Sequence, residues 1–553
     1  MNYLQRKKLA FMSIVNGVKG FVRTVLGVPP LTLPDCVDTD SVINYKIDGN
    51  SVQDGTPTPE APVEVESVGE KTANLLSGIN RAFSILSTYT IADNVLTITP
   101  TSKNAYQTYV SIKLGNLELG KTYTVSWNID FNASSGAKPL TRVGYRGASN
   151  KWSDIKTRTA ATSGRYNITF TLPEIMPEDM QSYGFCMLFN YTSVAATELV
   201  DYKIYDIMLV SGDTATDYEP FGYKIPVKCS GKNMFDKDAF CDYYNSFNHA
   251  TRKAKANDNY LGEDCFSYYM IHPSSDVNEF IWLKGAFKEN TQYVISGNFA
   301  MDFPGMDSRA GVLMFFKYTD STTLTPTLTM YKDKFVQSKF VSDEGKTIDY
   351  IYIANFSATA KIYIKDFQIE EGTEATAYEP YVEPVTTNIY LDEPLRKIGS
   401  YADYIDFESG CVVRNTQKAT LTSDKAYSYT TYGNGVRFNN VLQEGGDRYA
   451  GLCTHSKDVK LTSVAGGMWC GVNTTTSVYW IGIIDVLGLT TIDEFKEWLD
   501  TQSVEVICGK NTDVVEPITL PKLPTFKGTT IYSIDTAIQP SNMEVSYYST
   551  SKE

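Results

Sequence analysis

The stretch YDIMLVSGDTATDYEPF (205–221) returns as KDFQIEEGTEATAYEPY (365–381), 160 residues further along the chain. The two copies share an Asp, a Gly and the string Ala-Thr-x-Tyr-Glu-Pro at corresponding positions, namely Asp206, Gly212, Ala215, Thr216, Tyr218, Glu219 and Pro220 against Asp366, Gly372, Ala375, Thr376, Tyr378, Glu379 and Pro380. The shared Gly suits a turn that requires positive φ, and the Glu-Pro pair stops the preceding strand from continuing. The repetition therefore predicts two tandem copies of one module, with these positions serving its architecture.

Two further pairs of segments support the repeat: ANLL (73–76) against KNMF (232–235), and KTYTVSWN (121–128) against NTQYVISGN (290–298). Within the modules, apolar and polar residues alternate, as in the set Tyr123, Val125, Trp127, Ile129 and Phe131. A period of two places one face of each strand in a core and the other in water. We therefore expect antiparallel sheets stacked in two layers, as in a β-sandwich.

Beyond residue 385 the pattern changes. Residues 390–414 suggest a strand, a tight turn and a hairpin around Glu408–Gly410. Thr491 and Glu494 have the spacing of a capping box, and Ile492, Phe495 and Leu499 share one helical face. Strands follow this short helix, which indicates a third, β-dominated domain.

Apolar residues in the first 34 positions recur at heptad spacing: Leu4, Phe11, Val15, Val18, Val22 and Val25. This seam predicts an amphipathic helix that ends at Pro29-Pro30. About three heptads are too few for a stable isolated helix, so the seam must dock on something. Copies of the same chain, another protein and the body of this chain all remain possible partners.

The predicted fold class is thus mainly β, with tandem antiparallel β-sandwich modules of jelly-roll type, an N-terminal helix and a C-terminal β-dominated domain that contains one short helix. The predicted division is an anchoring or oligomerisation helix, a linker with an edge strand, two sandwich modules and a C-terminal domain, at residues 1–34, 35–73, 74–228, 229–385 and 386–553.

Composition narrows the class of function. The chain contains 38 Tyr, 26 Phe and 6 Trp, which is typical of strands and of adhesive surfaces, and its net charge is −14. No basic stripe is present, which argues against nucleic-acid binding. Nine Cys without a CxxC pair indicate synthesis in a reducing cytoplasm. The sequence contains no run of about 18 apolar residues, so we expect no transmembrane helix. Three His at unsuitable spacing give no reason to expect a metal or cofactor.

Several segments together resemble the minor structural, tail-tip proteins of tailed bacteriophages and prophages of Gram-positive gut bacteria. They are GNSVQDGTPTPEAPVEVESVG (49–69), the two GxxATxYEP closings, TTNIYLDEPLRKIGSYADYIDFESG (386–410) and the FKEWL helix (495–499). The modules also resemble jelly-roll carbohydrate-binding modules. The resemblance implies a virion component at the tail tip or baseplate that is made in the bacterial cytoplasm, assembles with other tail proteins and is often oligomeric. It implies no catalytic residue.

No catalytic motif stands out. His455 near Cys453 is the closest nucleophile–base pair, but neither residue lies in a known signature. We therefore expect a protein that is not an enzyme. Paired carboxylates for glycan cleavage cannot be recognised from sequence alone, because their separation is a property of the fold. Calcium between loops, common in jelly rolls, also stays open.

Glycan binding is the sharper hypothesis. The polar segment RVGYRGASNKWSDIKTR (142–158) places suitable side chains in an expected loop between strands: Tyr145, Arg146, Asn150, Trp152 and Asp154. Aromatic rings stack on sugar C–H faces, and the polar groups hydrogen-bond sugar hydroxyls. The alternative is that Trp152 only covers the edge of the sandwich.

The sequence thus predicts a non-catalytic tail-tip or baseplate component that contributes to host adsorption, with receptor binding and scaffolding both open. A glycan-binding or glycan-cleaving accessory protein and a bacterial surface adhesin are the alternatives. The short apolar seam suggests a homotrimer.

Overall fold

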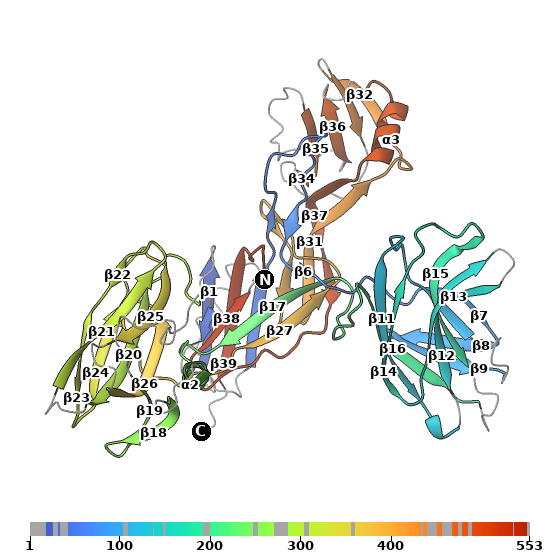
Figure 1. Ribbon diagram of the computed structural model, residues 1–553. Helices are drawn as coiled ribbons and strands as arrows, with labels where there is room; N and C mark the ends of the chain where they lie inside the picture. Colours follow the sequence, from blue (N-terminus) through green and yellow to red (C-terminus); the bar gives the residue numbers. More distant parts are fainter. Residues whose placement is uncertain are drawn as a thin grey trace.

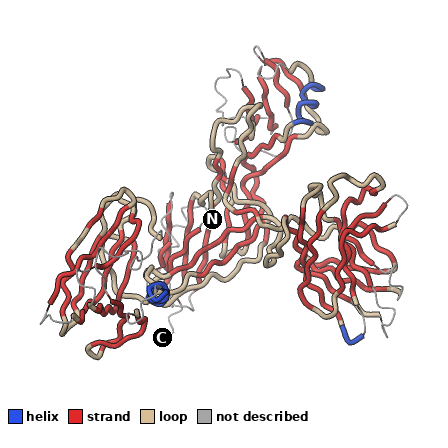
Figure 2. The backbone as a smooth tube through the Cα atoms, in the orientation of Figure 1, coloured by secondary structure: helices blue, strands red, loops and turns tan. Residues whose placement is uncertain are grey.

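The computed structural model describes residues 18–25, 31–33, 42–102, 109–135, 138–147, 151–191, 199–246, 253–269, 286–303, 309–354, 360–432, 435–439, 451–455, 467–473, 478–484, 489–534 and 536–549. As predicted, the fold is mainly β. Figure 1 shows two β-sandwiches on either side of a central group of strands, and a smaller lobe beyond it. Figure 2 shows that strands dominate every lobe and that helix is confined to short segments.

The first sandwich, module 1, consists of two five-stranded antiparallel sheets with the orders β13-β12-β15-β10-β7 and β14-β11-β16-β9-β8. Its strands are β7 (Arg81–Ile85), β8 (Ser87–Ala92), β9 (Val95–Pro100), β10 (Tyr109–Lys113), β11 (Thr122–Phe131), β12 (Pro139–Gly147), β13 (Trp152–Thr159), β14 (Gly164–Thr171), β15 (Met180–Tyr191) and β16 (Tyr202–Ser211). The 3-10 turn Ala133–Ser135 follows β11. The predicted alternation places Val125, Trp127 and Ile129 of β11 in the core between the sheets.

Half of the polar face of β11 is covered, although Asp130 on the same face is exposed. Thr124 and Ser126 are buried because the repeated segment after β16 folds over them. The Thr124 hydroxyl donates to the carbonyl of Gly212 at 2.9 Å, and Arg165 donates both to Ser126 Oγ and to the Thr216 carbonyl. Gly212 has φ of +98°, which agrees with the predicted turn.

The second sandwich, module 2, repeats this plan with one sheet of order β18-β19-β26-β20-β24 and a second in which β21 pairs with β22, β23 and β25. Its strands are β18 (Lys255–Tyr260), β19 (Glu263–Tyr269), β20 (Tyr293–Asp302), β21 (Arg309–Tyr318), β22 (Thr323–Leu324), β23 (Thr327–Tyr331), β24 (Val336–Val341), β25 (Ile348–Ala354) and β26 (Lys361–Glu371). Module 2 also contains a helix that the sequence analysis missed, α2 (Lys237–Ser246). Asp236 caps it by accepting from the amides of Asp238 and Ala239.

A third sandwich lies between the modules and is assembled from distant parts of the chain. One sheet has the order β1-β39-β3-β30-β31-β37-β34, and the other has β2-β38-β17-β27 with β6 beside β17. Their bounds are β1 (Val18–Val25), β2 (Leu31–Leu33), β3 (Val42–Asp48), β6 (Glu70–Lys71), β17 (Tyr223–Ser230), β27 (Val385–Leu391), β30 (Tyr404–Asp406), β31 (Cys411–Leu421), β34 (Gly451–Cys453), β37 (Val504–Pro517), β38 (Thr530–Ile534) and β39 (Asn542–Ser549). The short pair β4 (Ser51–Val52) and β5 (Glu66–Ser67) adjoins it. The division predicted between residues 228 and 229 falls inside β17.

The smaller lobe grows from the far ends of β31 and β37 (Figure 1). It contains the hairpins β32 (Ser428–Tyr432) with β33 (Gly435–Asn439) and β35 (Gly467–Asn473) with β36 (Val478–Ile484), while β28 (Lys397–Ile398) and β29 (Tyr401–Ala402) form a hairpin at its base. The predicted helix is confirmed as α3 (Ile492–Thr501). Its capping box is complete, since Thr491 accepts from the amide of Glu494 and Glu494 accepts from that of Thr491.

The predicted N-terminal helix is wrong over Val18–Val25. These residues form β1, which pairs antiparallel with β39 along its whole length. Val18 and Val22 are β-branched and Gly20 lies between them, so this part of the seam disfavours helix and suits a strand. Of the predicted seam, Val18, Val22 and Val25 lie on β1, whereas Leu4, Phe11 and Val15 lie outside the described residues.

Each module is closed by a buried Asn at its start. In module 2, Asn233 donates to the carbonyls of Phe367 and Glu379, both at 3.0 Å, and accepts from the amides of Phe235 and Ile369. In module 1 the same position does the same: Asn74 bonds to the carbonyls of Ile207 and Glu219 and to the amides of Leu76 and Leu209. The repeated Tyr-Glu-Pro segment therefore ties the end of each module to its beginning. We call this contact the Asn clasp.

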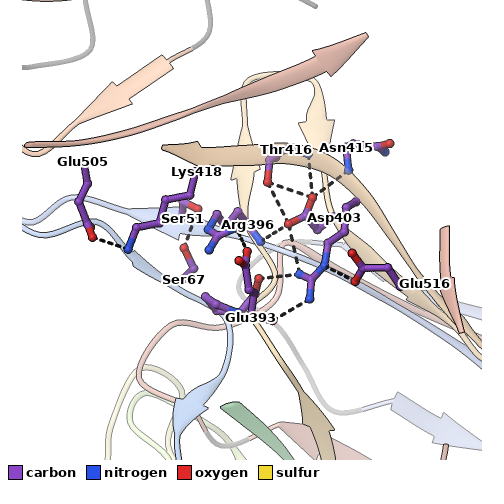
Figure 3. Close-up of polar contacts among 12 residues, drawn as sticks. Ser51, Ser67, Glu393, Arg396, Asp403, Asn415, Thr416, Lys418, Glu505 and Glu516 are labelled. Carbon is purple, nitrogen blue, oxygen red and sulfur yellow. Dashed lines mark hydrogen bonds and ion pairs between the residues drawn. The ribbon is translucent and has the colours of Figure 1, made fainter. Parts of the chain in front are cut away.

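A second polar network, shown in Figure 3, surrounds the fully buried carboxylate of Asp403. This carboxylate accepts from the amides of Asn415 and Thr416 and from the Thr416 hydroxyl, at a bulge where β31 leaves the central sandwich for the smaller lobe. Arg414 lies 3.5 Å from it and donates to the carbonyls of Glu393 and Pro394. The network therefore holds the bulge between Arg414 and Thr416, through which β31 passes into the smaller lobe.

Asn233→Ala is expected to lower the free energy of unfolding of module 2 by about 2 kcal/mol, because buried carbonyls and amides lose their partners. Loss of hydrogen-exchange protection at the β26 amides measures this. Asn259→Ala, an exposed Asn of the same module, is the control and should change stability by less than about 0.5 kcal/mol. Equal effects of the two substitutions would contradict the role of the clasp.

Asp403→Ala is expected to destabilise the central sandwich by about 3–5 kcal/mol, because the 5%-exposed Arg414 side chain loses its buried partner. Urea unfolding of the full chain measures the change. Glu516→Gln is the matched control: its side chain lies 3.4 Å from the same guanidinium but is 47% exposed, so the expected loss is below about 1 kcal/mol.

Candidate functional site

The described residues of the predicted glycan-binding segment, 142–147 and 151–158, lie almost entirely in strands and not in a loop. Tyr145 and Arg146 lie on β12, and Trp152 and Asp154 lie on β13, in an antiparallel hairpin at the edge of one module 1 sheet. Asn150 lies outside the described residues. The polar composition of 142–158 suggests a loop, but β12 pairs with both β13 and β15, so its residues belong to the sheet.

The pleat of β12 separates two of the predicted residues. Tyr145 faces inward, where its ring meets that of Phe185 edge-on at 6.2 Å and packs against the core of module 1. Arg146, one residue further, faces the opposite side. Tyr145 is therefore part of the sandwich core and not of a shared surface with Arg146 and Trp152.

The outer side of this sheet carries an aromatic group that the sequence analysis did not assemble. Phe83 of β7 and Tyr109 of β10 pack edge-on at 5.7 Å, and Phe83 also meets Trp152 at 6.3 Å. Leu188 of β15 lies beneath them. Tyr183 extends the group, since its ring lies 5.3 Å from that of Phe83 and is 36% exposed.

Charged groups bracket these rings. Arg142 donates two parallel hydrogen bonds to the Asp154 carboxylate, from Nε at 2.8 Å and from Nη2 at 2.7 Å, and the Trp152 indole N–H donates to the same carboxylate at 2.7 Å. The Arg146 guanidinium lies 4.5 Å from the centre of the Phe83 ring and donates to the Tyr109 hydroxyl at 3.2 Å. Burial raises the pKa of Tyr109, so its hydroxyl stays protonated at neutral pH.

We call this set the outer-face cluster: Phe83, Tyr109, Arg142, Arg146, Trp152 and Asp154. The structure brings three of the predicted site residues together, Arg146, Trp152 and Asp154, and adds three that were missed. The alternation of Val110 and Ile112 already indicated that Tyr109 points outward. Nothing local pointed to Phe83, which joins the cluster only through the pairing of β7 with β10.

Gly144 fixes where the Trp152 ring lies. A Cβ at this position would stand 2.0 Å from the Ser153 carbonyl oxygen and 3.1 Å from the Trp152 ring, so only Gly fits here. The position coincides with a bulge between β12 and β13. The backbone therefore approaches the indole closely, and the ring is held both from below and by its N–H bond to Asp154.

His455 and Cys453, the nucleophile–base pair that the sequence offers, are both buried in the smaller lobe. His455 is 1% exposed; its Nδ1 lies 2.9 Å from the Thr454 hydroxyl and its Nε2 lies 3.4 Å from Gln502 Oε1. Burial lowers the pKa of this imidazole. Both ring nitrogens are thus engaged inside the smaller lobe. His249 and His272 lie outside the described residues. Across the described chain, no helix has the length and hydropathy to cross a membrane.

No protein-family model matches the chain, and a search of curated proteins finds no match. Among solved structures, the tandem CBM22-1–CBM22-2 domain of Xyn10C from Paenibacillus barcinonensis is similar at 12% identity, covering 54% of this chain and 100% of that one, with a TM-score of 0.22. The N-terminal cellulose-binding domain of β-1,4-glucanase C from Cellulomonas fimi is similar at 18% identity, covering 27% and 98%, with a TM-score of 0.20.

The PBSX exported protein XepA is similar at 11% identity, covering 58% of this chain and 99% of that one, with a TM-score of 0.13. At these values the likenesses carry no argument about function.

Proposed function

We propose that the chain is a non-catalytic glycan-binding protein, and that module 1 binds sugar through its outer-face cluster. The observation that carries this proposal is the Trp152 ring, held beside the Arg142–Asp154 pair on the outside of a sheet. A fixed ring offers a flat apolar surface to the C–H face of a pyranose without loss of side-chain entropy on binding.

The polar groups of the cluster suit sugar hydroxyls. Asp154 accepts hydrogen bonds and its side chain is 38% exposed, whereas the Arg142 side chain is 18% exposed and is held in one orientation by the two-pronged bond. A planar guanidinium and a carboxylate in fixed positions can donate to and accept from neighbouring hydroxyls. The half-buried site thus combines one apolar face with a small number of oriented polar groups, as carbohydrate recognition requires.

We further propose that the protein belongs to the tail tip or baseplate of a bacteriophage virion and contributes to adsorption. The segments that resemble tail-tip proteins support this role, as does an architecture of β-sandwiches grouped around one centre. In this proposal the central sandwich is the scaffold, module 1 contacts a glycan of the host surface, and the partners are other tail proteins.

Trp152→Ala should weaken glycan binding at least tenfold, because the stacking surface is removed while the strands remain paired. Binding of the full chain to an array of bacterial surface polysaccharides measures this. Tyr145→Phe is the matched control on the inner face of β12 and should bind as the natural chain does. Undiminished binding by Trp152→Ala, or release of reducing ends from the bound polysaccharide, would contradict the proposal.

A homotrimer is the predicted assembly. The heptad seam predicts it as a core of three helices. The Val18–Val25 part of that seam is a strand paired with β39, so this part cannot form a helical core. Light scattering of the full chain should give three times the 61.7 kDa chain mass. A mass of one chain over the micromolar range would contradict self-association without bearing on docking to another tail protein.

A further inference from the structure

Module 2 contains a cavity of about 520 Å³ that the proposed function does not use. Three elements form its walls: the start of α2, the β18–β19 hairpin and the segment of β26 around Asp366. The closing segment of the module, with Tyr378 and Tyr381, forms the fourth. In Figure 1, α2 lies at the end of module 2 that adjoins the central strands.

The floor of the cavity is apolar and rigid. It consists of side chains from the core of module 2: Phe235, Phe266, Ile364 and Phe367. Phe235 and Phe367 pack edge-on at 4.6 Å, and the Asn clasp binds the backbone amide of Phe235 and the backbone carbonyl of Phe367. The floor is therefore formed before any ligand arrives, which lowers the entropy cost of binding.

Two Tyr rings stand in the wall. Tyr378 is 47% exposed although it is a large aromatic residue, and burial beside Asp366 raises the pKa of its hydroxyl. Tyr381 donates to Glu383 at 3.0 Å, and burial with the nearby Glu383 and Asp236 raises its pKa to about 12. Both hydroxyls are protonated at neutral pH, so each ring presents an apolar face and a hydrogen-bonding tip.

The rim is polar. Lys237 donates to Asn257 at 2.9 Å and joins α2 to β18, while Lys365 pairs with Glu263. The remaining carboxylates that line the cavity are Asp236, Asp238, Asp258, Asp264 and Asp366. Asp258 pairs with Lys361 at 2.7 Å, whereas among the described residues Asp236, Asp264 and Asp366 form no ion pair. Each of these three accepts hydrogen bonds from neutral groups only: backbone amides, Asn259 and Asn298 respectively. The rim thus offers acceptors to hydroxyl or amine donors and repels an anion.

Module 1 shares part of this arrangement but not its walls. Asp206 and Tyr218 correspond to Asp366 and Tyr378, and both Asp residues adopt φ near +50° at the same bulge. In module 1, however, only residues 77–80 lie between the opening segment ANLL (73–76), which contains Asn74, and β7. There is no room for a counterpart of α2. Tyr218 instead lies near Tyr390 of β27. The helix is therefore what encloses the space in module 2.

We propose that this cavity is a second carbohydrate site, which takes one or two pyranose rings that carry no negative charge. Its volume falls within the roughly 300–1,000 Å³ of small-molecule pockets, and its apolar floor, exposed Tyr faces and acceptor-rich rim match the surfaces of a sugar. The site is separate from the outer-face cluster and stands or falls independently of it.

The test uses the full chain with Trp152→Ala, so that the outer-face cluster does not contribute. Glucose, glucosamine and glucuronic acid are the probes, and saturation-transfer NMR with titration gives their affinities. Glucose or glucosamine should bind, and glucuronic acid should bind at least tenfold more weakly. Failure of the first two sugars to bind, or equal binding of glucuronic acid, overturns the proposal.

Tyr378→Ala should weaken binding of the preferred sugar at least tenfold. Tyr218→Ala, the same position in module 1, is the matched control and should leave the affinity unchanged. Asp264→Ala, on the exposed rim, provides a second variant that does not alter the module's closing segment and should weaken binding at least threefold. Equal effects of Tyr378→Ala and Tyr218→Ala, or normal affinity in both Tyr378→Ala and Asp264→Ala, contradict the assignment.

Discussion

The pairing of β17 is the constraint on which the architecture depends. This strand lies between β27 and β38, and the chain enters it directly from module 1 and leaves it directly into module 2. Its side chains Ile225, Val227 and Cys229 are fully buried in the core of the central sandwich. Both modules are therefore insertions into the central sandwich, and the ladder at β17 joins strands that are distant in the sequence.

Sequence reasoning predicted the parts whose signals are local. The alternation in β11, the repeated closing segments and the capping box of α3 all depend on residues a few positions apart. The central sandwich gives no such local signal. Its strands pair across long stretches of sequence, as β17 does with β38 and β3 does with β39. Of the missed residues of the outer-face cluster, Phe83 has the same cause, since it reaches Trp152 across strands that are distant in sequence, whereas Arg142 lies within the predicted segment itself.

The errors also have physical causes. Val18 and Val22 are four residues apart, a spacing that is compatible both with one face of a helix and with one side of a strand. The strand forms because β39 supplies a pairing partner along its whole length. The polar residues of 142–158 indicate a loop, but an outer sheet face tolerates Arg and Asp when they pair with each other, as Arg142 and Asp154 do. The buried residues of α2, Phe240, Cys241 and Tyr244, do share one helical face, but Phe and Tyr are residue types that favour strands, which hides the helix in the sequence.

The double connection at the base of module 1 has a mechanical consequence. The chain enters module 1 after β6 and leaves it at the start of β17, and these two strands are paired through Lys71 and Tyr223. A pulling force on module 1 is therefore divided between two adjacent strands. Along β17 that tension acts in shear against the hydrogen bonds to β27 and β38, which must then rupture together instead of one after another. Such a junction resists being pulled out of the central sandwich, whereas a flexible connector of the same length would simply extend under load.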